Sequence, residues 1–86
     1  MEDGYYMKPR EHYEKLFAEY PDVVTLPEFR EMLGGIADNT ARKIIRGNHV
    51  YHFYIRDTYL IPKPSVIEYV LSEHYAEYSK KLKVQV

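Results

Sequence analysis

The chain has 86 residues and no cysteine, which predicts one small domain and excludes disulfide frameworks and thiolate metal sites. The lack of cysteine fits a reducing compartment, and we expect a cytoplasmic protein. No apolar run approaches the roughly 20 residues that span a bilayer, so no membrane partner is expected. The net charge of −1, taken alone, argues against a nucleic-acid partner.

The distribution of charge is more informative than its sum. Residues 37–63 carry five basic and two acidic side chains, a net of +3, whereas the remainder carries seven basic and eleven acidic side chains, a net of −4. Basic charge therefore gathers in one internal stretch, which is the pattern of a local contact surface for nucleic acid.

Residues 1–8 show no apolar periodicity and are expected to form a flexible arm. Residues 9–20 are expected to form an amphipathic helix that packs across the domain, with a partner-binding helix as the alternative. Pro21 ends this helix. Its apolar residues recur at helical spacing: Tyr13, Leu16, Phe17 and Tyr20.

A second, shorter helix follows a brief extended segment at residues 22–24. Thr25 and Glu28 have the spacing of a capping box, and Pro27 suits the first turn. Gly34 lies where a left-handed C-cap residue is required. The buried face of this helix is predicted to consist of Leu26, Phe29, Met32 and Leu33.

A third helix is predicted after a turn in which Ile36 fills the gap between the two helices. Asp38 or Asn39 is expected to cap it, and Gly47-Asn48 to end it. Ala41, Ile44 and Ile45 share its buried face. The opposite, polar face is centred on Asn39, Lys43 and Arg46, with Thr40 and Arg42 beside them.

A hairpin is predicted from two β-branched and aromatic runs, residues 50–55 and 59–61, joined by a tip at residues 56–58. Strict alternation places four side chains toward the core: Phe53, Ile55, Tyr59 and Ile61. The same alternation points Tyr54 and Leu60 outward.

Residues 62–65 break the strand and open a longer closing helix that runs to about residue 81. Its apolar stripe is Val66, Ile67, Val70, Leu71, His74 and Tyr78. The basic residues Lys80, Lys81 and Lys83 suit a helix C-terminus and are interpreted as a solvated end. Residues 9–81 thus form a single domain with a tail at 82–86, mainly α with a small β-hairpin.

This order of elements is that of a winged helix-turn-helix, and the sequence resembles the excisionase-type DNA-binding proteins. These are small winged helix-turn-helix domains related to the mercury-resistance-regulator group, and the lead-in at residues 16–25 is similar to that of members from Gram-positive mobile elements. Four segments carry the resemblance: residues 31–34, Asn39-Thr40-Ala41, Tyr59 with Ile61-Pro62-Lys63, and Val66-Ile67-Glu68-Tyr69.

The resemblance implies sequence-specific binding of double-stranded DNA, with the second helix of the motif in the major groove and the hairpin wing along the backbone. By position, the DNA-binding residues would be Asn39, Thr40, Arg42, Lys43 and Arg46 on the helix, and Tyr54, Arg56 and Thr58 on the wing. The implied role is a recombination directionality factor that steers a tyrosine-recombinase integrase, with a small transcriptional regulator as the alternative.

The wing differs from the family pattern, which has several basic residues and a glycine. Here it carries Arg56 offset by Asp57, and the turn before the recognition helix carries Asp38. Fewer phosphate contacts lower both the affinity and its salt dependence, so binding is expected to rely on homo-oligomerisation or on a partner.

Two other classes remain as alternatives. The basic helix face could be an ordinary solvated surface, and the hairpin, with Tyr51, Phe53, Tyr54 and Tyr59, could be a protein-interaction patch. An enzyme is not expected, because no catalytic constellation, metal-ligand spacing or cofactor motif is present. His49 and His52 are interpreted as surface or phosphate-adjacent residues, and His74 as packing at the rim of the core.

Overall fold

The computed structural model describes residues 9–82, with side chains through Tyr78. The arm predicted at residues 1–8, residues 83–86 of the tail predicted at 82–86, and the basic side chains near the C-terminus lie outside the described residues. About half of the chain is helical. The described elements are α1 (Pro9–Leu16), β1 (Val23–Thr25), α2 (Leu26–Met32), α3 (Asp38–Arg46), β2 (Phe53–Ile55), β3 (Thr58–Pro62), α4 (Lys63–Val70) and α5 (Glu73–Leu82).

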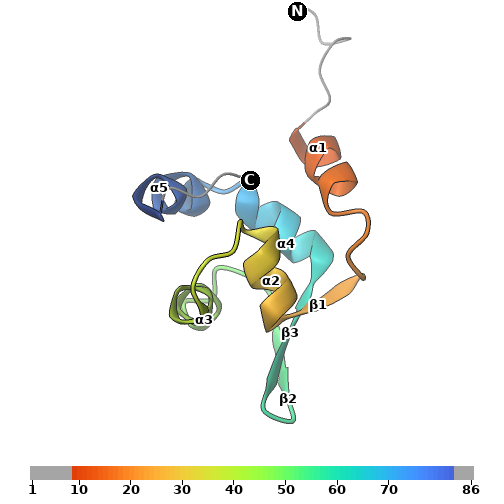
Figure 1. The fold of residues 1–86 in the computed structure, drawn as a ribbon, viewed down its shortest axis with the longest axis vertical. Helices are drawn as coiled ribbons and strands as arrows, with labels where there is room; N and C mark the ends of the chain where they lie inside the picture. The colour runs from red at the N-terminus through yellow and green to blue at the C-terminus, as the bar shows by residue number, and fades with distance from the viewer. Residues whose placement is uncertain (1–8, 83–86) are drawn as a thin grey trace, which may run out of the picture.

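The strands form a three-stranded antiparallel sheet in the order β1-β3-β2. Val24 of β1 lies opposite Ile61 of β3, and both side chains are fully buried. The sequence predicted a two-stranded hairpin and an unpaired extended segment, so the pairing of β1 is a correction. Figure 1 shows the β2–β3 end of the sheet projecting away from the helices.

The predicted start and end of α2 are confirmed. Thr25 and Glu28 form the capping box, which satisfies backbone N–H groups at both positions. After the C-cap residue Leu33, Gly34 and Gly35 adopt φ values of 90° and 83°, a left-handed conformation that glycine adopts without steric cost.

The core lies where α2, α3 and α4 meet the central strand β3. Ile36 fills the gap after the glycine turn and is 4% exposed, as the sequence predicted. The predicted buried face of α3 is also confirmed. The residues with the lowest exposure include Phe17, Val24, Phe29, Leu33, Ile44, Ile45, Ile61, Val66 and Tyr69.

The helix α1 ends at Leu16, four residues before the predicted end. Leu16 is 50% exposed and does not belong to the buried stripe, whereas Phe17 is buried. Residues 17–20 instead make tight turns, because the chain must reverse before Pro21 to enter β1. Lys63 holds this turn by donating from Nζ to the carbonyl oxygens of Phe17 (3.3 Å) and Tyr20 (2.8 Å).

The predicted closing helix is divided into α4 and α5. Ser72 Oγ donates to the carbonyl of Tyr69 at 2.6 Å and accepts from the backbone N–H of Tyr75 at 3.2 Å. These local bonds end one helix and cap the next, which is how serine competes with a continuous helix. Leu71, predicted on the apolar stripe, lies at this break and is 41% exposed.

Replacing Ile44 by alanine is expected to lower the free energy of unfolding by about 2–5 kcal/mol, because a fully packed side chain is replaced by a cavity. Chemical denaturation followed by circular dichroism measures this change. The exposed neighbour Lys43→Ala is the matched control and should change stability by less than about 0.5 kcal/mol. Equal effects of the two variants would contradict the described burial of α3.

Candidate nucleic-acid interface

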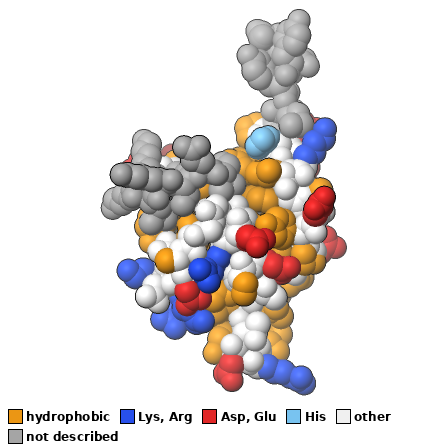
Figure 2. Space-filling model, in the orientation of Figure 1, with side chains coloured by type: hydrophobic (Ala, Val, Ile, Leu, Met, Phe, Trp, Pro, Cys, Tyr) orange, Lys and Arg blue, Asp and Glu red, His pale blue; other side chains and the backbone are white. Residues whose placement is uncertain are grey.

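The five residues predicted on the polar side of α3 share one face of that helix. Asn39, Lys43 and Arg46 are exposed, and Thr40 and Arg42 are half-buried. Figure 2 shows Lys and Arg side chains gathered over the region of α3. These residues therefore present one continuous polar surface, which we call the α3 face: Asn39, Thr40, Arg42, Lys43 and Arg46.

The N-terminus of α3 differs from the prediction. The N-cap residue is Ala37, which has no side-chain cap, so neither Asp38 nor Asn39 caps the helix. Asp38 is the first residue of α3, and its Oδ2 accepts from Arg42 Nε at 2.7 Å. This hydrogen bond, together with the attraction of the carboxylate, raises the pKa of Arg42. Asp38 thus neutralises one of the three basic side chains of the α3 face.

Tyr59 of β3 connects the α3 face to the sheet. The guanidinium of Arg42 lies over the Tyr59 ring, 5.9 Å from its centroid, which is a cation–π distance. Arg46 Nε donates to the Tyr59 hydroxyl at 3.5 Å. The sequence placed Tyr59 on the inner side of the hairpin but gave no sign of these contacts, because they join residues far apart in the chain.

The hairpin turn contains two residues, not the three that the sequence predicted. Arg56 and Asp57 have φ values of 52° and 63°, and Ile55 pairs with Thr58. Two successive left-handed residues are the signature of the type I′ turn, which matches the twist of paired strands. The shorter turn shifts the expected pairing of β2 by one residue.

A one-residue shift moves every side chain of β2 to the opposite face of the sheet. Phe53 and Ile55, predicted toward the core, lie on the outer face with Leu60 and are 45% and 51% exposed. Tyr54, predicted outward, shares the inner side with Tyr59, at 4.8 Å between ring centroids. The inner side of the hairpin is therefore aromatic and adjoins the α3 face.

The tip of the hairpin carries the remaining predicted contact residues. The Tyr54 hydroxyl donates to Asp57 Oδ1 at 3.4 Å, and Thr58 Oγ1 donates to the carbonyl oxygen of Arg56 at 3.3 Å. All four side chains are exposed. Figure 2 shows basic and acidic side chains side by side at this tip, so its net charge is close to zero.

Lys63 belongs to the basic stretch of the sequence but not to the basic surface. Its backbone N–H donates to the carbonyl oxygen of Asp22 at 2.7 Å, and its ammonium group holds the turn after α1. The charge available on and beside the α3 face therefore comes mainly from Lys43, Arg46 and Arg56.

A pair of histidines beside the α3 face is a feature that the sequence did not reveal. The rings of His49 and His74 are stacked with 3.6 Å between centroids and 19° between planes. His74 Nδ1 is 2.8 Å from the Tyr69 hydroxyl. Loss of solvent and then the neighbouring His49 lower the pKa of His74. Burial raises the pKa of Tyr69, so this hydroxyl stays protonated at neutral pH.

A hollow of about 200 Å³ lies against this pair, between α3 and α5. We call it the histidine hollow; its lining is Lys43, Ile44, His49, His74 and Tyr78. Lys43 thus belongs both to the hollow and to the α3 face. The pairing could not be found from the sequence, because it depends on the break at Ser72 that directs α5 back toward α3.

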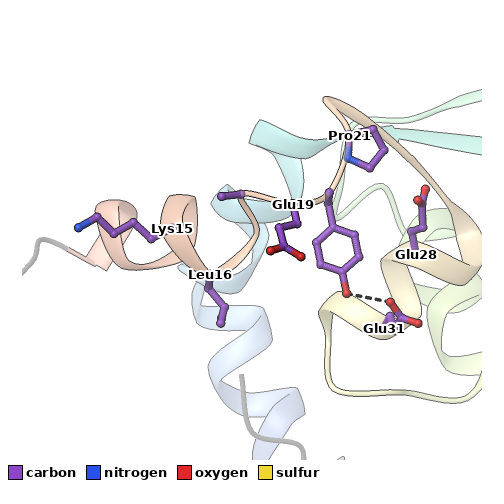
Figure 3. Close-up of a pocket in the computed structure, with 8 residues that line it drawn as sticks. Lys15, Leu16, Glu19, Pro21, Glu28 and Glu31 are labelled. Carbon is purple, nitrogen blue, oxygen red and sulfur yellow. Dashed lines mark hydrogen bonds between the residues drawn. The ribbon is translucent and has the colours of Figure 1, made fainter.

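A larger hollow of about 600 Å³ lies on the α1 side of α2 (Figure 3). Its lining includes the carboxylates of Glu19, Glu28 and Glu31. The Tyr20 hydroxyl donates to Glu31 Oε1 at 2.9 Å, and this bond raises the pKa of Tyr20. These three carboxylates outnumber the one cationic side chain in the lining, Lys15, so the hollow is unfavourable for an anion such as phosphate.

Within residues 9–82, no helix is long and apolar enough to cross a lipid bilayer. In the same range, no three histidine, aspartate or glutamate side chains come together as metal ligands. Comparison with known proteins found no matching family model, no similar curated protein and no similar solved structure.

Proposed function

We propose that this protein binds duplex DNA as a winged helix-turn-helix domain. In this proposal α2 and α3 form the motif, α3 enters the major groove, and the β2–β3 hairpin is the wing. The observation that carries the proposal is the α3 face: an exposed polar and basic helix surface on a rigid core, next to a projecting hairpin (Figure 1).

The dimensions and chemistry of α3 suit base recognition. An α-helix with its side chains is about 10–12 Å in diameter, which fits the roughly 12 Å width of the major groove, and α3 presents nine residues along it. Asn39 and Thr40 lie in the first turn, the part of a recognition helix that reaches base edges. An asparagine amide pairs with adenine, and an arginine such as Arg46 pairs with guanine or a phosphate.

The wing would add few phosphate contacts. Arg56 lies at the hairpin tip beside Asp57, so this region attracts the backbone weakly. Because the wing attracts DNA weakly, we expect the protein to act on DNA together with other molecules. These would be further copies of itself, or the integrase of a mobile element whose excision it would direct. A transcriptional regulator of the same fold is the alternative role, and binding to DNA from the element ends or from a promoter distinguishes the two.

Replacing Lys43 and Arg46 together by alanine is expected to weaken duplex binding, by about 1–3 kcal/mol for each residue that contacts a base. The double variant should also lower the slope of log affinity against log salt by about two, since two cations no longer displace counterions. Fluorescence anisotropy at several salt concentrations measures both quantities, and circular dichroism checks the fold.

The matched control is Arg10→Ala with Lys15→Ala, which removes the same charge from exposed positions on α1. These residues lie away from α3, so the slope should remain that of the wild type. A wild-type slope in the Lys43 and Arg46 variant would place the interface elsewhere, and a lowered slope in both variants would indicate a response to net charge alone.

Replacing Asp57 by asparagine is expected to tighten DNA binding by up to about fivefold, because exposed charge interactions amount to about 0.2–1 kcal/mol. Asparagine tolerates the left-handed φ of 63° at this position, so the turn should be preserved. Glu19→Gln removes the same charge in the acidic hollow and should leave the affinity unchanged. Unchanged binding by Asp57→Asn would mean that the hairpin tip does not approach DNA.

A second candidate function is protein binding through the outer face of the sheet. Four apolar side chains there and beside it are strongly exposed: Val23 (45%), Tyr51 (70%), Phe53 (45%) and Ile55 (51%). Val23, Phe53 and Ile55 lie on the side of the sheet away from Tyr59, and the Tyr51 ring packs against Phe53, so a protein could bind there while α3 holds DNA. Contiguous apolar surface of this kind marks interaction sites.

Replacing Phe53 by lysine is expected to weaken self-association on this face at least tenfold, on the order of 1.4 kcal/mol, without altering binding of a single copy to DNA. Sedimentation velocity over a concentration series measures the first effect, and anisotropy with a short duplex measures the second. A wild type that stays monomeric at every concentration, both free and on DNA, would exclude self-association through this face.

A further inference from the structure

The histidine hollow has the chemistry of an anion site. The polar residues that line it are Lys43, His49, His74 and Tyr78, and the side chains of all four can donate hydrogen bonds. Among the residues that the structure describes, no carboxylate lines it, in contrast to the acidic hollow beside α1 with its three glutamates. Its volume of about 200 Å³ is several times the roughly 30 Å³ of one water molecule, enough for a phosphate group.

We infer that the histidine hollow binds a backbone phosphate of the DNA and takes up a proton as it does so. This inference rests on the proposed function, because Lys43 connects the hollow directly to the α3 face. A duplex whose bases contact α3 has its flanking backbone at the ends of that helix. His49 lies three residues after Arg46, the last residue of α3, and its ring lies beside Gly47, where we expect a flanking phosphate to pass.

The stacked geometry explains why a proton is taken up. Two imidazoles 3.6 Å apart cannot both carry a charge without strong repulsion, so the free pair holds less positive charge than two separate histidines. A bound phosphate offsets this repulsion and favours the charged form. Tyr69 accommodates both states, because its hydroxyl can donate to Nδ1 of neutral His74 or accept from the protonated ring.

The other titratable groups around the pair do not account for the uptake of a proton when phosphate binds. Lys43 faces it from α3 and, like the second histidine, disfavours protonation until an anion binds. Tyr69 from α4 faces it as a neutral hydroxyl, because burial raises the pKa of Tyr69, and the ring of Tyr78 from α5 packs against His74. Glu73 and Glu77 of α5 are exposed and do not line the hollow.

The test is the pH dependence of duplex binding at constant ionic strength between pH 6 and pH 8. Since the free pair has a lowered affinity for protons and the bound pair a higher one, binding should tighten as the pH falls, by at most tenfold per pH unit for one proton. His49→Gln and His74→Gln should each flatten this dependence. The matched control His12→Gln, on α1, should keep the wild-type dependence.

His52 needs a separate control because it lies beside the hairpin, with 5.9 Å between the centroids of its ring and the Tyr59 ring. His52→Gln should also keep the wild-type pH dependence. A wild-type dependence that survives in both His49→Gln and His74→Gln would overturn the inference. Loss of the pH dependence of duplex binding in His52→Gln would also overturn the inference, because the proton would then be taken up beside the hairpin.

Nuclear magnetic resonance of the histidine side chains in the wild-type protein separates this inference from the proposed function and needs no substitution. Addition of duplex should raise the pKa of the His49–His74 pair. If the protein binds no duplex but inorganic phosphate raises the pKa of the pair, the proposed function fails and the hollow is a site for free phosphate. If duplex binds but neither duplex nor inorganic phosphate raises the pKa of the pair, the proposal of DNA binding stands and the inference fails.

Discussion

The turn between α2 and α3 fixes the direction in which α3 presents its polar face. Gly34 and Gly35 reverse the chain in left-handed conformations, and Ile36 then inserts into the core. Arg30 stabilises this arrangement, because its Nε donates to the carbonyl oxygen of Ile36 at 2.8 Å. A hydrogen bond to a charged donor contributes about 1.5–3 kcal/mol. With the turn fixed, Ile44 is buried, and the opposite side of α3 must face solvent next to the hairpin.

The electrostatics of this face are weaker than the number of basic residues indicates. Asp38 neutralises Arg42, Asp57 accompanies Arg56 at the hairpin tip, and Lys63 is used to hold the turn after α1. DNA binding that depends on so few free cations needs additional contacts. The histidine hollow would supply one of these contacts, with a charge that appears when the phosphate arrives. The exposed outer face of the sheet would supply another, through protein contacts that leave α3 free.

The sequence by itself determined the features that depend on neighbouring residues. The capping box between Thr25 and Glu28 and the left-handed Gly34 follow from backbone hydrogen bonding and sterics within one turn. The buried face of α3 follows from the 3.6-residue period, which also places Lys43 and Arg46 on the exposed side. The helical candidate site was therefore predictable, since its residues share one short helix.

Only the tertiary structure decided what depends on pairing between distant segments. The two-residue turn at Arg56 and Asp57 set the register of β2, and alternation in a strand cannot reveal a one-residue shift. The third strand β1 required the edge of β3, which no local pattern encodes. The contact of His49 with His74 required the break at Ser72 and the return of α5 toward α3. Local hydrogen bonds and periodicity act within a few residues, whereas these contacts depend on how the finished elements pack together.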